Sequence, residues 1–75
     1  MEIEWRDESG PIGIRLFCFR PNGIDYEYHS WTVIDTQVSQ LTISDGTDDG
    51  CGLVVVDVTD RAHAERIIRA IEDSE

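Results

Sequence analysis

The chain has 75 residues, which is enough for one domain with one small core. Sixteen Asp and Glu residues oppose six Arg and no Lys, so the formal net charge is -10 and the sequence pI is about 4.3. This balance excludes the clustered basic side chains that direct nucleic-acid binding needs, while two Trp, two Tyr and two Phe argue against a disordered acidic tail.

No segment has the character of a membrane span or a secretory signal. The longest apolar run, Leu53–Val56, falls far short of the roughly 20 residues of a membrane helix. Residues 1–5 lack the basic start and apolar stretch of a signal peptide. We therefore expect a soluble protein of the cytoplasm, in a bacterial host cell. In that reducing compartment Cys18 and Cys51 are expected to be free thiols. Arginine without lysine fits a GC-rich coding sequence, as in many soil bacteria and their phages or in halophilic archaea.

The N-terminal part alternates with the period of two that is typical of strands. Apolar and charged residues alternate over 2–6, which predicts a short strand. The best strand pattern covers 12–20, where the even positions up to Cys18 are apolar. Arg15, Phe17 and Phe19 lie on the opposite face of that strand.

A hairpin is expected after this strand, because Asn22-Gly23 is typical of a type I′ turn. The returning strand covers 25–34, and its weaker pattern near Ser30 predicts a bulge. The aromatic residues Tyr26, Tyr28 and Trp31 are expected to pack the sheet against the rest of the fold or to act as binding anchors.

Another strand follows over 38–43. The near-continuous apolar run over 52–58 predicts a central strand that is buried on both faces. From Asp60 the apolar period changes to 3.6, which predicts a helix over 60–73 with Thr59 or Asp60 as its N-cap. Its apolar stripe comprises Ala64, Ile67, Ile68 and Ile71, and its charged residues, Glu65 and Glu72 included, are expected to face water.

Together these elements predict an α+β fold in a single domain over 1–75. An antiparallel meander of four to five strands would carry one C-terminal α-helix packed on one face. We expect a monomer or a weak homodimer, in which 2–6 or 38–43 serves as an unpaired edge strand.

The residues that commonly carry catalysis do not form a motif. His29 and Cys18 have no partner at a recognisable spacing, and two His and two Cys are too few for a zinc site. Asp45–Gly50 begins like a calcium loop, but position twelve of that pattern is Val56 instead of Glu. We therefore predict a non-enzymatic protein without a metal or cofactor.

The acidic residues are the strongest functional signal. Eight carboxylates and no basic residue lie between Asp25 and Asp60. Carboxylates at i and i+2 of a strand project about 6.6 Å apart, close to every second phosphate of a DNA strand at about 3.4 Å per phosphate. We therefore predict a DNA mimic whose contact charges are Glu2, Glu4, Asp25, Glu27, Asp35, Asp45, Asp48 and Asp49.

The acidic run 25–60, and the apolar strand 54–58 that leads into the helix, resemble the small anti-CRISPR proteins of phages and mobile elements. The resemblance covers the whole chain in size, plan and acidity. It implies a stoichiometric inhibitor that occupies a basic DNA-binding or PAM-binding surface of a CRISPR surveillance complex. The expected partner is thus a basic DNA-binding protein or CRISPR effector subunit.

Two other functions fit the same charge. A small domain from a halophile would use its acidity for hydration at molar salt, and it should lose its fold at low salt. An antitoxin or immunity protein would direct the same electrostatics at a basic nuclease.

Overall fold

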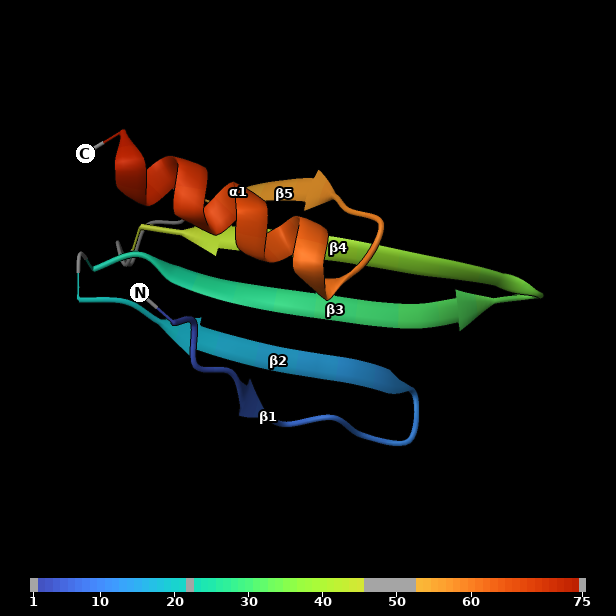
Figure 1. Cartoon of the computed structure of the whole chain (residues 1–75). Coiled ribbons are helices and arrows are strands. Elements are labelled where there is room, and N and C mark those ends of the chain that lie inside the picture. The colour runs from blue at the N-terminus through green and yellow to red at the C-terminus, as the bar shows by residue number, and fades with distance from the viewer. Residues whose placement is uncertain (1, 22, 46–52, 75) are drawn as a thin grey trace.

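The computed structural model describes residues 2–21, 23–45 and 53–74. In this part of the chain, five strands form one antiparallel sheet in sequence order, and one helix lies on one of its faces (Figure 1). The elements are β1 (Arg6–Asp7), β2 (Gly13–Phe19), β3 (Asp25–Val33), β4 (Thr36–Ser44), β5 (Val54–Asp57) and α1 (Arg61–Asp73). The predicted fold class, an antiparallel meander with one C-terminal helix, is confirmed.

The core lies between the sheet and α1. Leu16, Tyr28 and Leu41 are cross-strand neighbours on β2, β3 and β4, and all three are buried. Ala64 and Ile68 of the helix are fully buried against this cluster. The apolar stripe predicted for the helix therefore faces the sheet, where burying each large side chain contributes about 1.5–3 kcal/mol.

The helix begins where the sequence predicts. The Asp60 side chain accepts a hydrogen bond of 2.8 Å from the backbone N–H of His63, which satisfies a donor that the first helical turn leaves unpaired. His63 in turn uses its Nδ1 to accept the backbone N–H of Thr59 at 3.0 Å. Asp60 is therefore the N-cap.

Two strand predictions are wrong at the edges of the sheet. Of the segment 2–6, only Arg6 lies in a strand, since β1 comprises Arg6 and Asp7. Trp5 instead packs its ring edge-on against Tyr28 in the core, with the ring centroids 6.3 Å apart. The strand predicted over 52–58 is the edge strand β5 instead of a central one, and β4 lies inside the sheet. Val54 and Val55 are about half exposed, at 52% and 53%. An apolar run does not report how many neighbours a strand has, and here the chain turns from β5 directly into the helix.

The bulge predicted near Ser30 is absent from the described pairing. β3 pairs without interruption from Asp25 opposite Ser44 to Val33 opposite Thr36. Ser30 is instead buried and accepts a hydrogen bond of 3.1 Å from the hydroxyl of Ser39, its cross-strand neighbour. A buried serine pair thus weakens the apolar pattern without breaking the strand.

The β2–β3 hairpin is confirmed, but its turn lies one residue earlier than predicted. The N–H of Gly23 donates to the carbonyl of Arg20 at 3.1 Å, which places Pro21 second in the turn. The proline ring presets the φ angle that this position needs. Gly23 has φ of +85°, which glycine adopts without strain. The prediction for Asn22 itself lies outside the described residues.

A buried ion pair ties the helix to the sheet. The Arg20 guanidinium lies 2.8 Å from the Glu72 carboxylate, and the two side chains are only 6% and 18% exposed. Arg20 also donates to the backbone carbonyl of Glu2 at 3.1 Å, so it joins the N-terminal segment, β2 and α1. A second tie is the hydrogen bond of 2.9 Å from the Trp5 indole to Glu65. The prediction that Glu65 and Glu72 face water is therefore wrong, because both turn toward the sheet.

Replacing Glu72 with Gln should destabilise the protein by about 2–3 kcal/mol, because the Arg20 charge would stay buried without its counter-charge. Urea denaturation followed by circular dichroism measures the change. Arg69→Gln is the matched control: its side chain is 53% exposed and lies 3.6 Å from Glu65, so its loss should cost less than about 0.5 kcal/mol. Equal losses in the two variants would show that Arg20–Glu72 does not hold the helix.

Replacing Ile34 with Gly should stabilise the protein by about 1 kcal/mol, since Ile34 has φ of +58°, where a Cβ clashes with the following carbonyl. Ile34 is also 91% exposed, so the substitution removes little packing. Thermal unfolding should shift upward by several degrees. Ile12→Gly is the control, because Ile12 is 85% exposed without a positive φ and should gain nothing. An unchanged or lower midpoint for Ile34→Gly would contradict the assignment of strain.

Candidate protein-interaction surface

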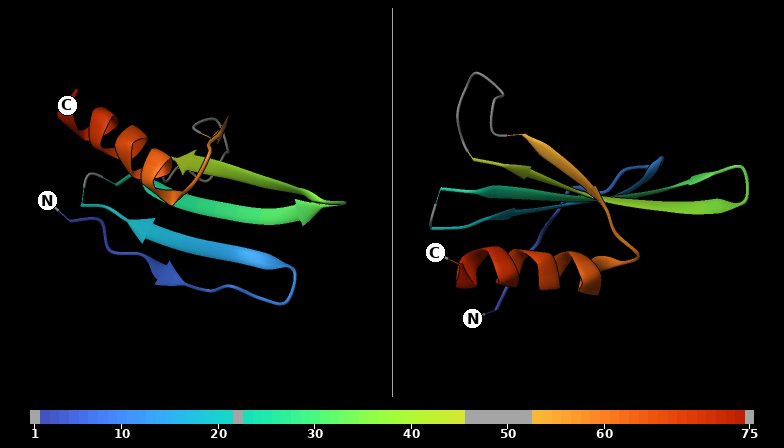
Figure 2. Two further views of the ribbon diagram at one scale, coloured as in Figure 1. Left: turned by 45° about the vertical axis from the view of Figure 1, so that its right-hand side comes forward. Right: turned by 90° about the horizontal axis from the view of Figure 1, so that it is seen from above.

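The second face of the sheet has no described element packed on it. Figure 2 shows α1 on one side of the sheet only. We call the opposite side the uncovered face. Strand alternation and the register place the following residues on it: Arg6, Arg15, Phe17, Phe19, Asp25, Glu27, His29, Trp31, Val33, Val38, Gln40, Thr42, Ser44, Val55 and Asp57.

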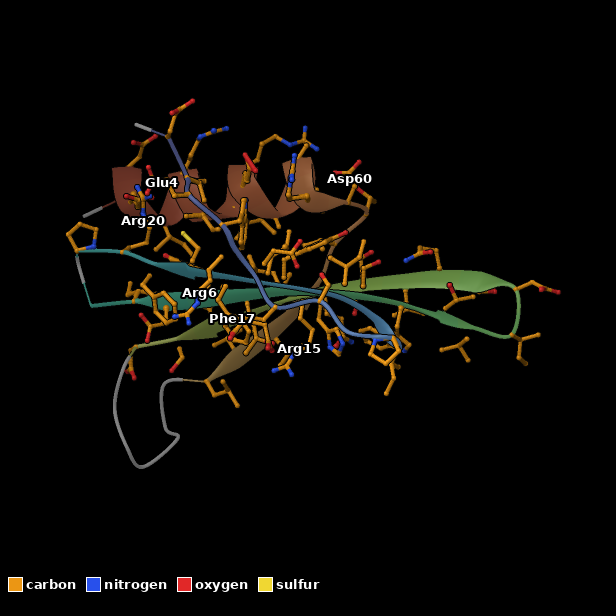
Figure 3. All side chains as sticks on the ribbon, turned by 90° about the horizontal axis from the view of Figure 1, so that it is seen from below. Glu4, Arg6, Arg15, Phe17, Arg20 and Asp60 are labelled. Carbon is orange, nitrogen blue, oxygen red and sulfur yellow. The ribbon has the colours of Figure 1, made fainter. Side chains whose placement is uncertain are left out.

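The alternation of β2 decides which aromatic residues reach this face. Leu16 and Cys18 are buried beneath the helix, so Phe17 and Phe19 point the other way. Figure 3 shows Arg6, Arg15 and Phe17 on the side of the sheet away from α1. Phe19 is 59% exposed. β2 thus presents Phe19 to solvent, and the half-buried Phe17 beside it, on the face opposite the core.

Aromatic rings lie in two contacting pairs on the uncovered face. The Phe17 and Phe19 rings are nearly parallel, at 6°, with centroids 6.3 Å apart. The His29 and Trp31 rings have centroids 4.7 Å apart. Clustered aromatic residues at a surface mark a binding surface more often than apolar residues that are scattered singly.

An internal ion pair crosses the same face. The Arg15 guanidinium carbon lies 5.2 Å from the centre of the Phe17 ring, and its Nη2 donates to Glu27 at 2.8 Å. Glu27 is the cross-strand neighbour of Phe17. Ring, carboxylate and guanidinium thus form one unit, in which the ring face attracts the cation and the carboxylate neutralises it.

A hollow lies at the end of the uncovered face that is nearest the β2–β3 turn. It has a volume of about 290 Å³, and we call it the Phe19 hollow. Phe17 and Phe19 supply its aromatic surface, and Glu8, Asp25 and Glu27 supply carboxylates. Tyr26, Thr42 and Ser44 complete the lining. Its chemistry suits a group that is cationic and flat.

The predicted contact charges do not gather in one place. Asp25 and Glu27 share the uncovered face, and Asp45 follows Ser44, the cross-strand neighbour of Asp25. Glu4 lies beside the helix, on the other side of the sheet (Figure 3). Asp35 lies beyond the opposite end of β3, a strand of nine residues and thus about 26 Å long.

The other predicted contact charges do not join Asp25 and Glu27 in one acidic surface. Glu2 is exposed and belongs to the N-terminal segment, whose carbonyl binds Arg20. Asp48 and Asp49 lie outside the described residues. The carboxylates that the structure brings together are therefore Asp25, Glu27 and Glu8, and Glu8 was not among the predicted contact charges.

Sequence reasoning also missed the role of the phenylalanines. The alternation of β2 places Phe17 and Phe19 opposite the core residues, and that signal was visible in the sequence. Of the three aromatic residues considered as anchors, Tyr26 and Tyr28 are buried in the core, and Trp31 lies on the uncovered face.

The described residues that resemble catalytic groups lie on opposite sides of the sheet. Cys18 is a free thiol, 1% exposed beneath the helix, whereas His29 contacts the Trp31 ring at a tilt of 41° on the uncovered face. No group of three or more His, Cys, Asp or Glu with metal-binding geometry occurs within 2–21, 23–45 and 53–74. Over the same ranges, no helix is long and apolar enough to cross a membrane.

Comparison with known proteins provides no relative for this architecture: no family model, curated protein or solved structure matches the chain.

Burial raises the pKa of the Cys18 thiol, and the nearby Arg20 guanidinium opposes this shift in part. A thiol whose pKa is raised by folding loses its proton more readily when unfolded. The stability that this thiol contributes should therefore be lost as the pH rises above its ordinary value of 9.0.

In a Cys51→Ser background, iodoacetamide at pH 8 should leave Cys18 unmodified in the folded protein and alkylate it once urea unfolds the chain. Mass spectrometry measures the modified fraction. The unfolded chain in urea is the internal control for reagent activity. Rapid alkylation under folding conditions would show that Cys18 is accessible and would reopen the question of a reactive thiol.

Proposed function

We propose that this protein is a non-enzymatic inhibitor that binds a basic, DNA-binding protein through the uncovered face of its sheet. The observation that carries the proposal is the exposure of Phe19, Val33 and Val55, beside the half-buried Phe17, on a face of the sheet that no described element covers. Carboxylates lie at one end of this face, in a chain of net charge -10. Aromatic anchors with a charged border are typical of protein-binding surfaces.

The two kinds of residue have different tasks in this proposal. A net charge of -10 attracts a positive surface over a distance of about one Debye length and raises the association rate. It gives little lasting affinity, since exposed charge pairs contribute at most about 1 kcal/mol each. The aromatic face supplies the area whose burial holds the complex together. Charge thus selects the partner, and the uncovered face retains it.

The preferred target is a subunit of a CRISPR surveillance complex that reads the PAM or holds target DNA, in the cytoplasm of a bacterial cell. The support is the resemblance in size, plan and acidity to anti-CRISPR proteins. Such subunits contact DNA through Arg and Lys, and a protein seated on those side chains excludes the duplex. The inhibitor would act without catalysis, cofactor or metal, and it would not bind nucleic acid itself.

A first experiment identifies the partner. The tagged protein is incubated with lysates of GC-rich bacteria that express CRISPR effectors, then washed at low and at high salt. Recovery of a DNA-binding effector subunit that competes with duplex DNA supports the proposal. Recovery of a nuclease instead would identify the protein as an immunity protein. Loss of its circular-dichroism signal at low salt would identify it as a halophilic domain. Either of the last two results overturns the proposed inhibitor.

Val55→Lys should weaken binding to the recovered partner by about tenfold or more, because it places a like charge and a long polar side chain within the contact area. Val54→Lys is the matched control. Val54 and Val55 are neighbours in β5 with nearly equal exposure, 52% and 53%, and they point to opposite faces of the sheet. Surface plasmon resonance at fixed salt compares the two. Equal losses of affinity would show that the uncovered face is not the contact surface.

A further inference from the structure

The end of the uncovered face repeats, in part, the arrangement that holds Arg15. In the complete unit, Phe17 and its cross-strand neighbour Glu27 receive the Arg15 guanidinium, at 5.2 Å from the ring centre and 2.8 Å from the carboxylate. The next pair on the same face is Phe19 with its cross-strand neighbour Asp25. Both pairs combine an aromatic ring with a carboxylate on the adjacent strand.

The second pair has the ring and the carboxylate but no arginine from the described chain. The next arginine along the chain, Arg20, lies on the other side of the sheet and pairs with Glu72. No described residue forms an ion pair with Asp25. The Phe19 ring is almost parallel to the Phe17 ring and 59% exposed, so its face is accessible.

The Phe19 hollow provides room at this position. Its volume of about 290 Å³ is enough for a guanidinium and the end of its aliphatic stem. Glu8 and Glu27 line the same hollow. Because Glu27 is paired with Arg15, Asp25 and Glu8 are the lining carboxylates without a described ion pair. Such a lining repels phosphate and attracts a cation.

We infer that the Phe19 hollow binds an arginine side chain of the partner, with its guanidinium stacked on Phe19 and paired with Asp25. This inference rests on the proposed function and specifies which partner group the uncovered face recognises. Arginine is favoured over lysine because its planar guanidinium stacks on a ring and pairs with a carboxylate through two parallel N–H groups. Within the same sheet, the Arg15 guanidinium lies 5.2 Å from a ring centre and donates two N–H groups to one oxygen of Glu27.

The inference is tested with a small probe that needs no knowledge of the partner. The ¹⁵N-labelled protein is titrated with the peptide acetyl-Gly-Arg-Gly-amide and, separately, with its lysine counterpart. The arginine peptide should shift the amide signals of Phe19 and Asp25 first, and it should bind about threefold or more tightly than the lysine peptide. Equal binding of the two peptides, or shifts centred elsewhere, would overturn the inference.

Two variants examine the two halves of the site. Phe19→Leu and Asp25→Asn should each lower the affinity for the arginine peptide by about fivefold. Asp35→Asn is the matched control, because it removes the same charge at the opposite end of β3 and should leave the affinity unchanged. Circular dichroism verifies that each variant is folded. An equal loss in Asp35→Asn would show that general charge, and not the Phe19 hollow, attracts the peptide.

The outcomes for the two proposals are separable. In one outcome, Val55→Lys abolishes capture of a basic partner while the arginine peptide leaves the amide signals of Phe19 and Asp25 unshifted. That result supports the proposed function and overturns this inference. If the peptide binds at Phe19 and Asp25 but no basic protein is captured through the uncovered face, the arginine site stands and the inhibitor function falls.

Discussion

One helix can cover only one face of this sheet, and the rest of the structure follows from that constraint. α1 has 13 residues and is about 20 Å long, whereas the nine-residue strands β3 and β4 each extend for about 26 Å. Leu16, Leu41 and Ile68 fill the single core beneath the helix. The opposite face keeps its side chains in water, so aromatic residues placed there are available for binding.

The acidity of the chain is divided among several roles. Glu72 neutralises the charge of the buried Arg20, and Glu65 accepts a hydrogen bond from the Trp5 indole. Both glutamates therefore help to attach the helix to the rest of the fold. Asp60 begins the helix as its N-cap. Glu27 pairs with Arg15 on the uncovered face. A count of carboxylates in the sequence therefore overstates the charge that is available to a partner, because a substantial part of it is already used within the fold.

The remaining charge and the aromatic face complement each other. In the proposed function, long-range attraction would bring a basic partner to the molecule, whereas exposed charges alone bind weakly and lose their effect in salt. Phe17, Phe19 and Trp31 offer apolar area that salt does not weaken. The proposed inhibitor would compete with DNA for the same basic side chains without copying the regular spacing of phosphates, since its carboxylates lie on different faces and ends of the sheet.

The sequence by itself determined the helix, the approximate positions of β2, β3 and β4, and the alternation of side chains along β2 and β3, because these depend on local periodicity. It left the N-cap open between Thr59 and Asp60, which the structure decides in favour of Asp60. The tertiary structure decided which segments lie beside one another. It places β5 at the edge of the sheet and β4 in its interior, and it pairs Arg20 with Glu72, 52 residues away. The candidate site follows the same division. Its phenylalanines could be read from alternation, but the pairing of Phe19 with Asp25 and the hollow beside them depend on register, which arises only when distant strands hydrogen-bond to each other.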